Sequence, residues 1–349
     1  MEDDRNTFPP APLVEVTRGS ITESRHRGHV VAVDGHGRIV AQLGAPETVT
    51  YLRSSAKPLQ AVPLVSTGAA DRFNFTSEEI AVACGSHSGE PLHEETVAAM
   101  LGKIGLSAGA LKCGVHEPFD KEVAQELRRR GEKPRVLQNN CSGKHTGMLA
   151  LALHLGGAPE TYDQPDNPAQ LAIAHTVAQF SGVPLDDIAL GVDGCGVPVF
   201  GVSVRAMALM YARLVAPPDV FDAQTRAASA RICAAMRAHP QLVGGTRERL
   251  DTELMRAAGG VVSKVGAEGV YTVGVEPSAR WPHGLGLALK VEDGEDRRAR
   301  PTVVIESLRQ LGLLDEAALE RLARYSKFVV RNHRGDEVGE VRASFELRR

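Results

Sequence analysis

The sequence predicts an α/β fold of the α+β kind, in which strands from both ends of the chain form one sheet around a helical insert. Three observations lead to this prediction. Residues 13–44 show strand-like patterns, residues 54–239 are mostly helical in pattern, and strand-like runs return after residue 259. Elements in this order are typical of a sheet that is assembled from both chain ends.

The first strands are expected within residues 13–41. Residues 13–17 alternate between apolar and polar side chains, and residues 29–33 form a run rich in valine. The sequence Asp-Gly-His-Gly at 34–37 then separates this run from residues 38–41. Glycine-rich turns between such runs are typical of a β-hairpin.

Helices are expected from Ser54 onward. Pro58 would lie in a first turn, where its missing N–H is tolerated. Thr76 and Glu79 have the spacing of a capping box ahead of an apolar run. Periodicity predicts further helices over residues 90–104, 146–155, 170–181 and 223–239.

The C-terminal third returns to strands and ends in helices. Strands are expected over residues 261–266, 269–274 and 284–291, and a helical pair over 302–311 and 316–325. The proline-rich polar segment 1–12 is expected to be a disordered tail. No linker interrupts residues 13–349, which we expect to form a single domain with two closely packed lobes.

Composition excludes several function classes. The net charge is −3, and acidic and basic residues are interspersed, which speaks against nucleic-acid binding and against a membrane-surface patch. No apolar run is long enough to span a bilayer, and the N-terminal segment lacks the basic-then-apolar order of a signal peptide. The sequence therefore predicts a cytoplasmic protein. Its five widely spaced cysteines are expected to be free thiols.

The first polar cluster is Arg53-Ser54-Ser55-Ala56-Lys57, an S-x-x-K step at the expected start of a helix. Ser54 and Lys57 would share a face, because three residues make almost one helical turn. A lysine whose pKa is lowered can take the proton of a serine hydroxyl, and helix N–H groups can stabilise an oxyanion. The alternative interpretation is a serine N-cap with a solvated lysine, and the pattern alone favours that alternative.

Two further clusters lie at polar junctions before apolar helices. Residues 85–90 read Gly-Ser-His-Ser-Gly-Glu and could bind a carboxylate or supply a second nucleophile, Ser86. A capping loop with Ser88 as N-cap explains the serines but not His87. Residues 139–145 read Asn-Asn-Cys-Ser-Gly-Lys-His. A structural turn rarely needs amide, thiol and cationic groups together, so this cluster favours a function.

The last two clusters lie near predicted strands. Asp193 and Cys195, two residues apart in the strand-like segment 191–198, would face the same side, although a buried cysteine in a turn is equally compatible. Lys264, on a predicted strand, could place its ammonium at the edge of a site or could be solvated. Cys141 and Cys195 could bind zinc as thiolates, with Lys144 joining as a neutral amine. Locally, two buried thiols remain the simpler interpretation.

Taken in order, these clusters resemble the L-asparaginase II family of the thermolabile, rhizobial type. The motifs that carry the resemblance are R-S-S-A-K-P, C-G-S-H-S-G-E, N-C-S-G-K-H-T-G-M, D-G-C-G-V-P and S-K-V-G-A, preceded by V-T-R-G-S-I-T-E-S-R-H-R-G. The likeness extends from about Leu13 to about Arg349. It implies a fold related to serine β-lactamases, penicillin-binding proteins and glutaminases. The cysteine and lysine of the central motif argue against β-lactam chemistry.

The resemblance also implies the composition of the site. It implies two Ser–Lys tandems, Ser54 with Lys57 and Ser86 with Lys264. It implies a zinc ion held by Cys141, Lys144 and Cys195, with Asp193 beside it. It suggests a homodimer.

These features together predict hydrolysis of the side-chain amide of L-asparagine through an acyl-enzyme on Ser54, with Lys57 as base. Arg53 and His87 are candidates for binding the substrate carboxylate, and Asp193 or Glu90 for binding its ammonium. Two alternatives stay open. One is another acyl-transfer enzyme on this fold, such as a glutaminase, an esterase or a peptidase. The other is a non-catalytic protein that binds zinc or an amino acid.

Overall fold

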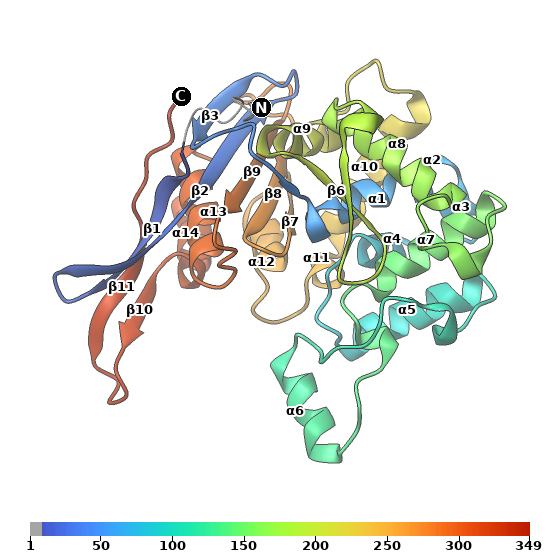
Figure 1. Cartoon of the computed structure of the whole chain (residues 1–349), viewed down its shortest axis with the longest axis horizontal. Helices are drawn as coiled ribbons and strands as arrows, with labels where there is room; N and C mark the ends of the chain where they lie inside the picture. Colours follow the sequence, from blue (N-terminus) through green and yellow to red (C-terminus); the bar gives the residue numbers. More distant parts are fainter. Residues whose placement is uncertain (1–8) are drawn as a thin grey trace, which may run out of the picture. The chain divides into compact units, whose positions relative to one another are not determined.

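The chain divides into two compact units, which we describe separately. The first comprises residues up to Ser55, together with 202–216 and 253–349, and the second comprises residues 56–201 and 217–252. The computed structural model describes residues 9–349 (Figure 1). Most of the predicted tail, residues 1–8, lies outside the described residues. The first strand begins at Ala11, so residues 11 and 12 belong to the sheet and not to a tail.

The first unit is built on one antiparallel sheet. Within the described residues its strands follow the order β10-β11-β1-β2-β9-β8-β7, and β3 pairs with the C-terminal part of β2. Strands β2 and β9 join the two halves of the chain, with Val31 opposite Ala288. This arrangement confirms the predicted sheet from both chain ends. The strands are β1 (Ala11–Arg18), β2 (Ile21–Asp34), β3 (Ile39–Leu43), β7 (Val261–Val265), β8 (Val270–Val275), β9 (Leu285–Val291), β10 (Phe328–Arg331) and β11 (Glu337–Ala343). The short strand β4 (Val49–Tyr51) also belongs to this unit.

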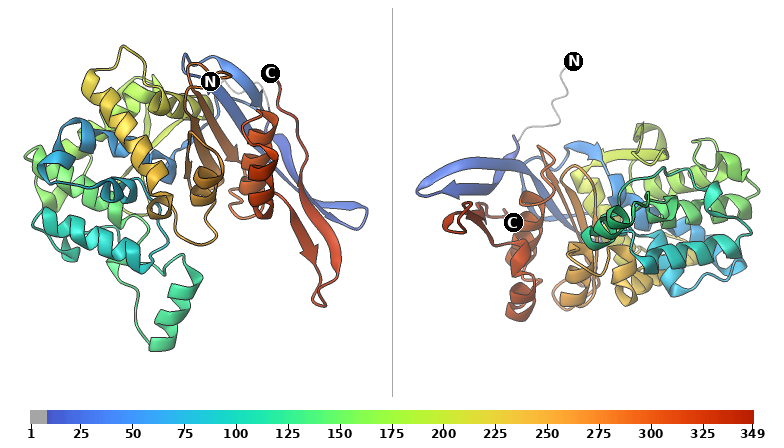
Figure 2. Two further views of the ribbon diagram at one scale, coloured as in Figure 1. Left: turned by 180° about the vertical axis from the view of Figure 1, so that it is seen from behind. Right: turned by 90° about the horizontal axis from the view of Figure 1, so that it is seen from below.

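Helices cover both faces of this sheet. Helix α9 (Val204–Val215) packs against β2, β8 and β9, and α13 (Ala299–Gln310) contacts β1, β8, β9 and β11 on the opposite face (Figure 2). Gly286 makes the approach of α9 possible, because a Cβ there would lie 1.8 Å from the carbonyl oxygen of Ala208. Helix α14 (Glu316–Arg321) follows α13.

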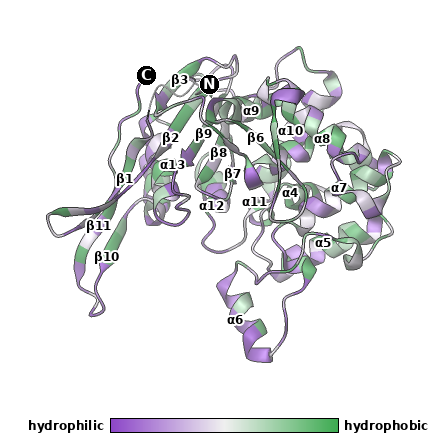
Figure 3. Ribbon diagram, in the orientation of Figure 1, coloured by the Kyte–Doolittle hydropathy of each residue, from purple (hydrophilic) through white to green (hydrophobic). Residues whose placement is uncertain are grey.

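The second unit is mainly helical. Helix α7 lies at its centre, and every residue from Ser142 to Ala152 is buried. Helices α2, α3, α4, α5 and α8 pack against it. The hydropathy colours show apolar residues in these central helices and polar residues along α6 (Figure 3). The helices are α1 (Lys57–Gln60), α2 (Val62–Ser66), α3 (Ala69–Arg72), α4 (Ser77–Ala83), α5 (Pro91–Lys103), α6 (Lys121–Arg130), α7 (Ser142–His154), α8 (Pro168–Ser181), α10 (Ala223–Ala238) and α11 (Pro240–Val243).

The remaining elements are a β-hairpin and a helix that spans a boundary between the two units in the sequence. Strands β5 (Ala189–Val192) and β6 (Pro198–Ser203) pair antiparallel. Strand β6 and helix α12 (Leu250–Ala257) carry the chain from one unit to the other. In the described part of the chain, no helix is both long and apolar enough to cross a membrane.

Two of the predicted features at helix starts are confirmed. The Thr76 hydroxyl accepts the Glu79 N–H at 3.4 Å, and the Glu79 carboxylate accepts the Thr76 N–H at 2.7 Å, which is the predicted capping box. Pro58 lies in the first turn of α1, as expected. Ser54 differs from the prediction: it lies in the 3₁₀ helix η1 (Arg53–Ala56) that leads into α1.

Candidate active site

Lys57 is the most deeply buried cation of the predicted site in the second unit. Its side chain is 1% exposed, and its Nζ donates to the Ser86 hydroxyl at 2.8 Å and to the Asn140 carbonyl at 3.1 Å. Burial lowers the pKa of Lys57, and the nearby Lys144 cation lowers it further, while the Cys141 thiol acts in the opposite direction. A lysine with a lowered pKa, bonded to a serine hydroxyl, has the geometry of a general base.

Ser54 lies three residues before Lys57 and is half-buried, whereas Ser86 is 2% exposed. The sequence pairs Lys57 with Ser54, but the hydroxyl that the structure places on its Nζ is that of Ser86. Arg53 adopts a left-handed backbone with φ 50° just before Ser54. Such a conformation is unfavourable for a non-glycine residue, by about 1 kcal/mol, and fixes the direction in which the next residue leaves the turn.

Lys264 lies on β7, as predicted, and is fully buried within the first unit. Its Nζ donates to the carbonyl of Val265 at 3.1 Å. The end of this strand approaches the segment that carries Ser54, because a Cβ on Gly266 would lie 2.9 Å from the carbonyl oxygen of Leu52. Glycine is therefore required at position 266 for this approach. The predicted tandem of Ser86 with Lys264 stays a prediction.

His87 is a neutral, buried histidine. Its Nδ1 accepts the backbone N–H of Gly89 at 3.2 Å, so its Nε2 carries the proton and donates to the Ser142 hydroxyl at 2.9 Å. Ser142 in turn donates to the carbonyl of Leu137. Burial holds the pKa of His87 well below its ordinary value, and the neighbouring His93 adds to the effect. The bonds at both ring nitrogens are compatible with a structural role, and the binding of the substrate carboxylate by His87 stays a prediction.

Glu90 is also engaged inside the second unit. One carboxylate oxygen accepts the Thr246 N–H at 2.8 Å, and the other accepts the Thr246 hydroxyl. Glu90 is 3% exposed, so these bonds satisfy a carboxylate that burial would otherwise destabilise. The roles of Glu90 and Asp193 as alternative partners for the substrate ammonium stay predictions.

The cysteines of the third and fourth clusters meet around Lys144. The Lys144 Nζ lies 3.0 Å from the Cys195 sulfur, and that sulfur lies 3.7 Å from the Asp193 carboxylate. A hydrogen bond from Cys195 holds the pKa of the Cys141 thiol well below its ordinary value, and the Lys57 and Lys144 cations act with it. Burial alone would lower the pKa of Lys144, but the Cys195 and Cys141 sulfurs and Asp193 together raise it. The cluster thus brings two buried cysteine sulfurs next to a buried lysine amine.

The segment that carries Asp193 and Cys195 is a turn and not a strand. β5 ends at Val192, and β6 begins at Pro198. The Gly196 N–H donates to the Asp193 carbonyl at 2.9 Å, with Gly196 at φ 87°, a left-handed conformation that glycine adopts readily. The two side chains still approach each other, because the tight turn bends the chain back on itself.

The potential metal ligands of this cluster suit a thiophilic metal ion only if the Lys144 amine is one of them. Two cysteine sulfurs and one amine converge, and sulfur and nitrogen are the atoms that zinc prefers. Among residues 9–349, no group of three or more His, Cys, Asp and Glu side chains is placed to hold a metal ion. Lys144 would therefore have to act as the third ligand, in its neutral form.

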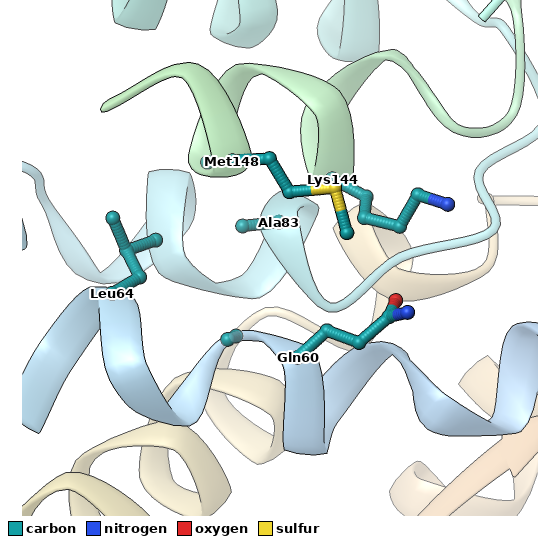
Figure 4. A pocket seen from close by; sticks show the side chains of 7 residues that line it. Gln60, Leu64, Ala83, Lys144 and Met148 are labelled. Atoms are coloured by element: carbon teal, nitrogen blue, oxygen red, sulfur yellow. The ribbon is translucent and has the colours of Figure 1, made fainter. Parts of the chain in front are cut away.

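A small cavity adjoins this cluster. It has a volume of about 10 Å³ and is lined by Gln60, Leu64, Ala83, Lys144 and Met148, with Ala61 and Gly147 (Figure 4). A volume of this size holds about one water molecule. The cavity is therefore too small to be the substrate pocket.

Residues 244–249 form a loop of the second unit that contacts the segment of Ser86, Ser88 and Glu90 through Thr246 and Arg249, and no local sequence pattern marks this loop as functional. Thr246 binds Glu90, Arg249 binds Ser86 and Ser88, and Arg247 forms two parallel hydrogen bonds with Asp120 at 2.7 and 2.8 Å. A signal was present in the arginine-rich sequence Gly-Gly-Thr-Arg-Glu-Arg, but nothing local distinguishes it from a solvated loop.

The ion pair of Asp120 and Arg247 predicts a pH dependence of stability. Burial acts to raise the pKa of Asp120, but the bonds from Arg247 and the Val123 N–H outweigh it, so the pKa is lowered. A lowered folded-state pKa stabilises the fold above the ordinary carboxyl value of about 4, and this contribution is lost as the pH falls through the folded-state value.

Asp120→Asn should lower the free energy of unfolding by about 2 kcal/mol at neutral pH, since the charged hydrogen bonds are lost. Urea denaturation measured from neutral to acidic pH checks this. The difference between variant and wild type should shrink as the pH falls. A difference that stays constant would contradict the assignment to this carboxylate.

The comparisons with known proteins agree with these clusters. A family model described as L-asparaginase II matches residues 14–343. The chain belongs to the L-asparaginase II family. Family membership makes the protein an amidohydrolase that acts on a small molecule. A search of curated proteins found no match.

Several solved structures resemble the chain weakly. A probable glutaminase from Bacillus subtilis, in complex with 6-diazo-5-oxo-L-norleucine, is 13% identical over 82% of this chain and 85% of its own, with a TM-score of 0.38. A β-lactamase from Burkholderia ambifaria is 14% identical over 86% of this chain and 93% of its own, with a TM-score of 0.37. A β-lactamase from Burkholderia vietnamiensis is 15% identical over 86% and 92%, with a TM-score of 0.35.

Proposed function

We propose that this member of the L-asparaginase II family hydrolyses L-asparagine to L-aspartate and ammonia through a serine acyl-enzyme. The observation that carries the proposal is the buried Lys57, whose Nζ is bonded to the Ser86 hydroxyl beside the Cys141 and Lys144 cluster. Burial lowers the pKa of this lysine, which gives it the character of a base without the help of a histidine.

In the proposed reaction, Ser54 is the nucleophile. Its Oγ attacks the side-chain amide carbon while Lys57 takes the hydroxyl proton. Lys57 returns that proton to the nitrogen, the C–N bond breaks, and ammonia leaves an ester on Ser54. Water then attacks the ester and gives a proton to Lys57, which passes it to the departing Ser54 oxygen. The spacing of three residues between Ser54 and Lys57 and the half-buried position of Ser54 support Ser54 as the nucleophile and Lys57 as its base.

The other predicted groups would position the reactants. Ser86, bonded to the Lys57 Nζ, would fix the direction of the lysine lone pair, and Lys264 would contribute positive charge. Arg53 would bind the substrate carboxylate, since its guanidinium presents a planar fork of donors. Asp193 would bind the ammonium.

We also propose that Cys141, Lys144 and Cys195 bind one zinc ion per chain. The ion would supply fixed positive charge that shapes the pocket and helps to bind the substrate, and the proposed serine–lysine chemistry does not require it. Binding would require Lys144 to lose its proton, which a metal ion favours.

Metal analysis of Cys195→Ala tests the zinc proposal. Purified wild-type protein should retain about one zinc ion per chain, and Cys195→Ala should retain far less, because a three-ligand site loses one of its two thiolates. Cys233→Ala is the matched control, since Cys233 is a buried thiol on α10. Elemental analysis that finds no zinc in the wild type, or equal zinc in Cys195→Ala, would contradict the site.

An ammonia-release assay on asparagine and glutamine, with a hydrolysis assay on an activated ester, tests the reaction and its specificity. Asparagine should give the highest kcat/KM of the three. Faster release from glutamine would favour a glutaminase, and faster ester cleavage would favour an esterase. Binding of asparagine without turnover would favour the non-catalytic alternative.

The thermolabile, rhizobial subtype and the homodimer are also part of the proposal. Light scattering on the purified protein checks the homodimer.

A further inference from the structure

The backbone of Ser86 is held on both sides by one distant segment of the second unit. The Ser86 N–H donates to the carbonyl of Val243 at 2.8 Å, and the Arg249 Nη2 donates to the carbonyl of Ser86 at 2.7 Å. These two bonds fix the two peptide planes that flank Ser86. The direction of its Cα–Cβ bond, and so the reach of its hydroxyl toward Lys57, is set by residues 243–249.

Arg249 also binds the side chain of Ser88. Its Nη1 donates to the Ser88 hydroxyl at 3.0 Å, and that hydroxyl donates to the carbonyl of Gly244 at 3.0 Å. One planar guanidinium therefore binds both the backbone carbonyl of Ser86 and the hydroxyl of Ser88. Its charge lies over the ring of Phe119, with 5.8 Å between the guanidinium carbon and the ring centroid.

We propose that Arg249 is a positioning residue for the catalytic serine–lysine pair, acting through Ser86. This inference rests on the proposed function, in which Ser86 fixes the Lys57 amine. Arg249 does not take part in the chemistry. It holds the turn of residues 86–90 in the one conformation in which the Ser86 hydroxyl meets the Lys57 Nζ. Lysine cannot replace it fully, because an ammonium lacks the fork that reaches two acceptors at once.

The experiment compares the variants Arg249→Ala and Arg249→Lys with a matched control in the same segment. Arg247→Ala is the control, because Arg247 pairs with the carboxylates of Asp120 and Glu122. Steady-state kinetics with asparagine give kcat and KM, thermal unfolding gives stability, and a crystal structure of Arg249→Ala gives the Lys57–Ser86 distance.

We expect Arg249→Ala to lower kcat by about 10- to 100-fold with KM changed by less than about threefold, because misplacement of a catalytic pair slows the reaction more than it weakens binding. Arg249→Lys should recover part of the loss. Arg247→Ala should lower the melting temperature and leave kcat near the wild-type value. The crystal structure of Arg249→Ala should show the turn displaced and the hydrogen bond between the Lys57 Nζ and the Ser86 hydroxyl broken.

Wild-type kcat in Arg249→Ala, or an intact Lys57–Ser86 hydrogen bond in its crystal structure, would overturn the inference. A wild-type protein that hydrolyses none of the test substrates would sink the proposed function instead, and the crystal structure would still decide the role of Arg249. Arg249→Gln, which keeps two N–H donors, takes the place of the alanine variant if the latter does not fold.

Discussion

Replacement of Ser54 by alanine should abolish ammonia release from asparagine while the protein remains folded. The hydroxyl forms the acyl bond in the proposed mechanism, and no other group of Ser54 takes part. Loss of the nucleophile removes the covalent step itself, and we expect kcat to fall by about 10³-fold or more. The half-buried position of Ser54 in η1 predicts a change in stability of less than about 1 kcal/mol.

Two matched variants show whether this loss belongs to the nucleophile. Ser55→Ala removes the neighbouring hydroxyl, which is fully buried and donates to the Leu52 carbonyl at 2.6 Å, so it should cost about 1 kcal/mol of stability and little activity. Ser86→Ala should lower kcat less than Ser54→Ala and leave acylation detectable by mass spectrometry. Full activity in Ser54→Ala, with acylation found on Ser86, would assign the nucleophile to Ser86.

The fold was largely predictable because its signals are local. Periodicity over about ten residues identifies a helix, and alternation identifies a strand, without knowledge of the partner. The prediction failed where partners decide the structure. Strands β10 and β11 form the outer part of the sheet, where the burial of β11 does not alternate regularly and residues 328–331 are too few to reveal a period. Helix α9 depends on the close approach at Gly286, which sequence periodicity does not reveal.

The contacts among the candidate site residues were harder to predict from the sequence than their secondary structure. The sequence identified Lys57 and Ser86, but it did not pair them, because their bond joins residues 29 positions apart. The sequence also did not reveal the burial of His87, whose two ring nitrogens both form hydrogen bonds inside the fold. Arg249 was missed because its partners lie about 160 positions away and its own neighbours resemble a solvated loop.

Replacement of Lys57 by methionine should separate catalysis from stability. The variant keeps most of the side-chain volume and removes the amine, so the base is lost and kcat should fall by about 10³-fold. Stability should change by no more than about 2 kcal/mol. The Ser86 hydroxyl and the Asn140 carbonyl lose a donor, which is unfavourable, but a buried cation is removed, which is favourable. Urea denaturation and the ammonia-release assay measure the two effects on the same samples.

Lys57→Arg then tells whether the lysine acts as a base or only as a positive charge. Arginine keeps the charge but does not lose its proton near neutral pH, so it cannot accept the proton of the serine. If Lys57 is the base, Lys57→Arg should be as inactive as Lys57→Met. Activity retained in Lys57→Arg would show that charge alone suffices and would refute the base. Lys103→Met is the control, because Lys103 forms an ion pair with Glu79 at 2.7 Å on the same unit and should affect only stability.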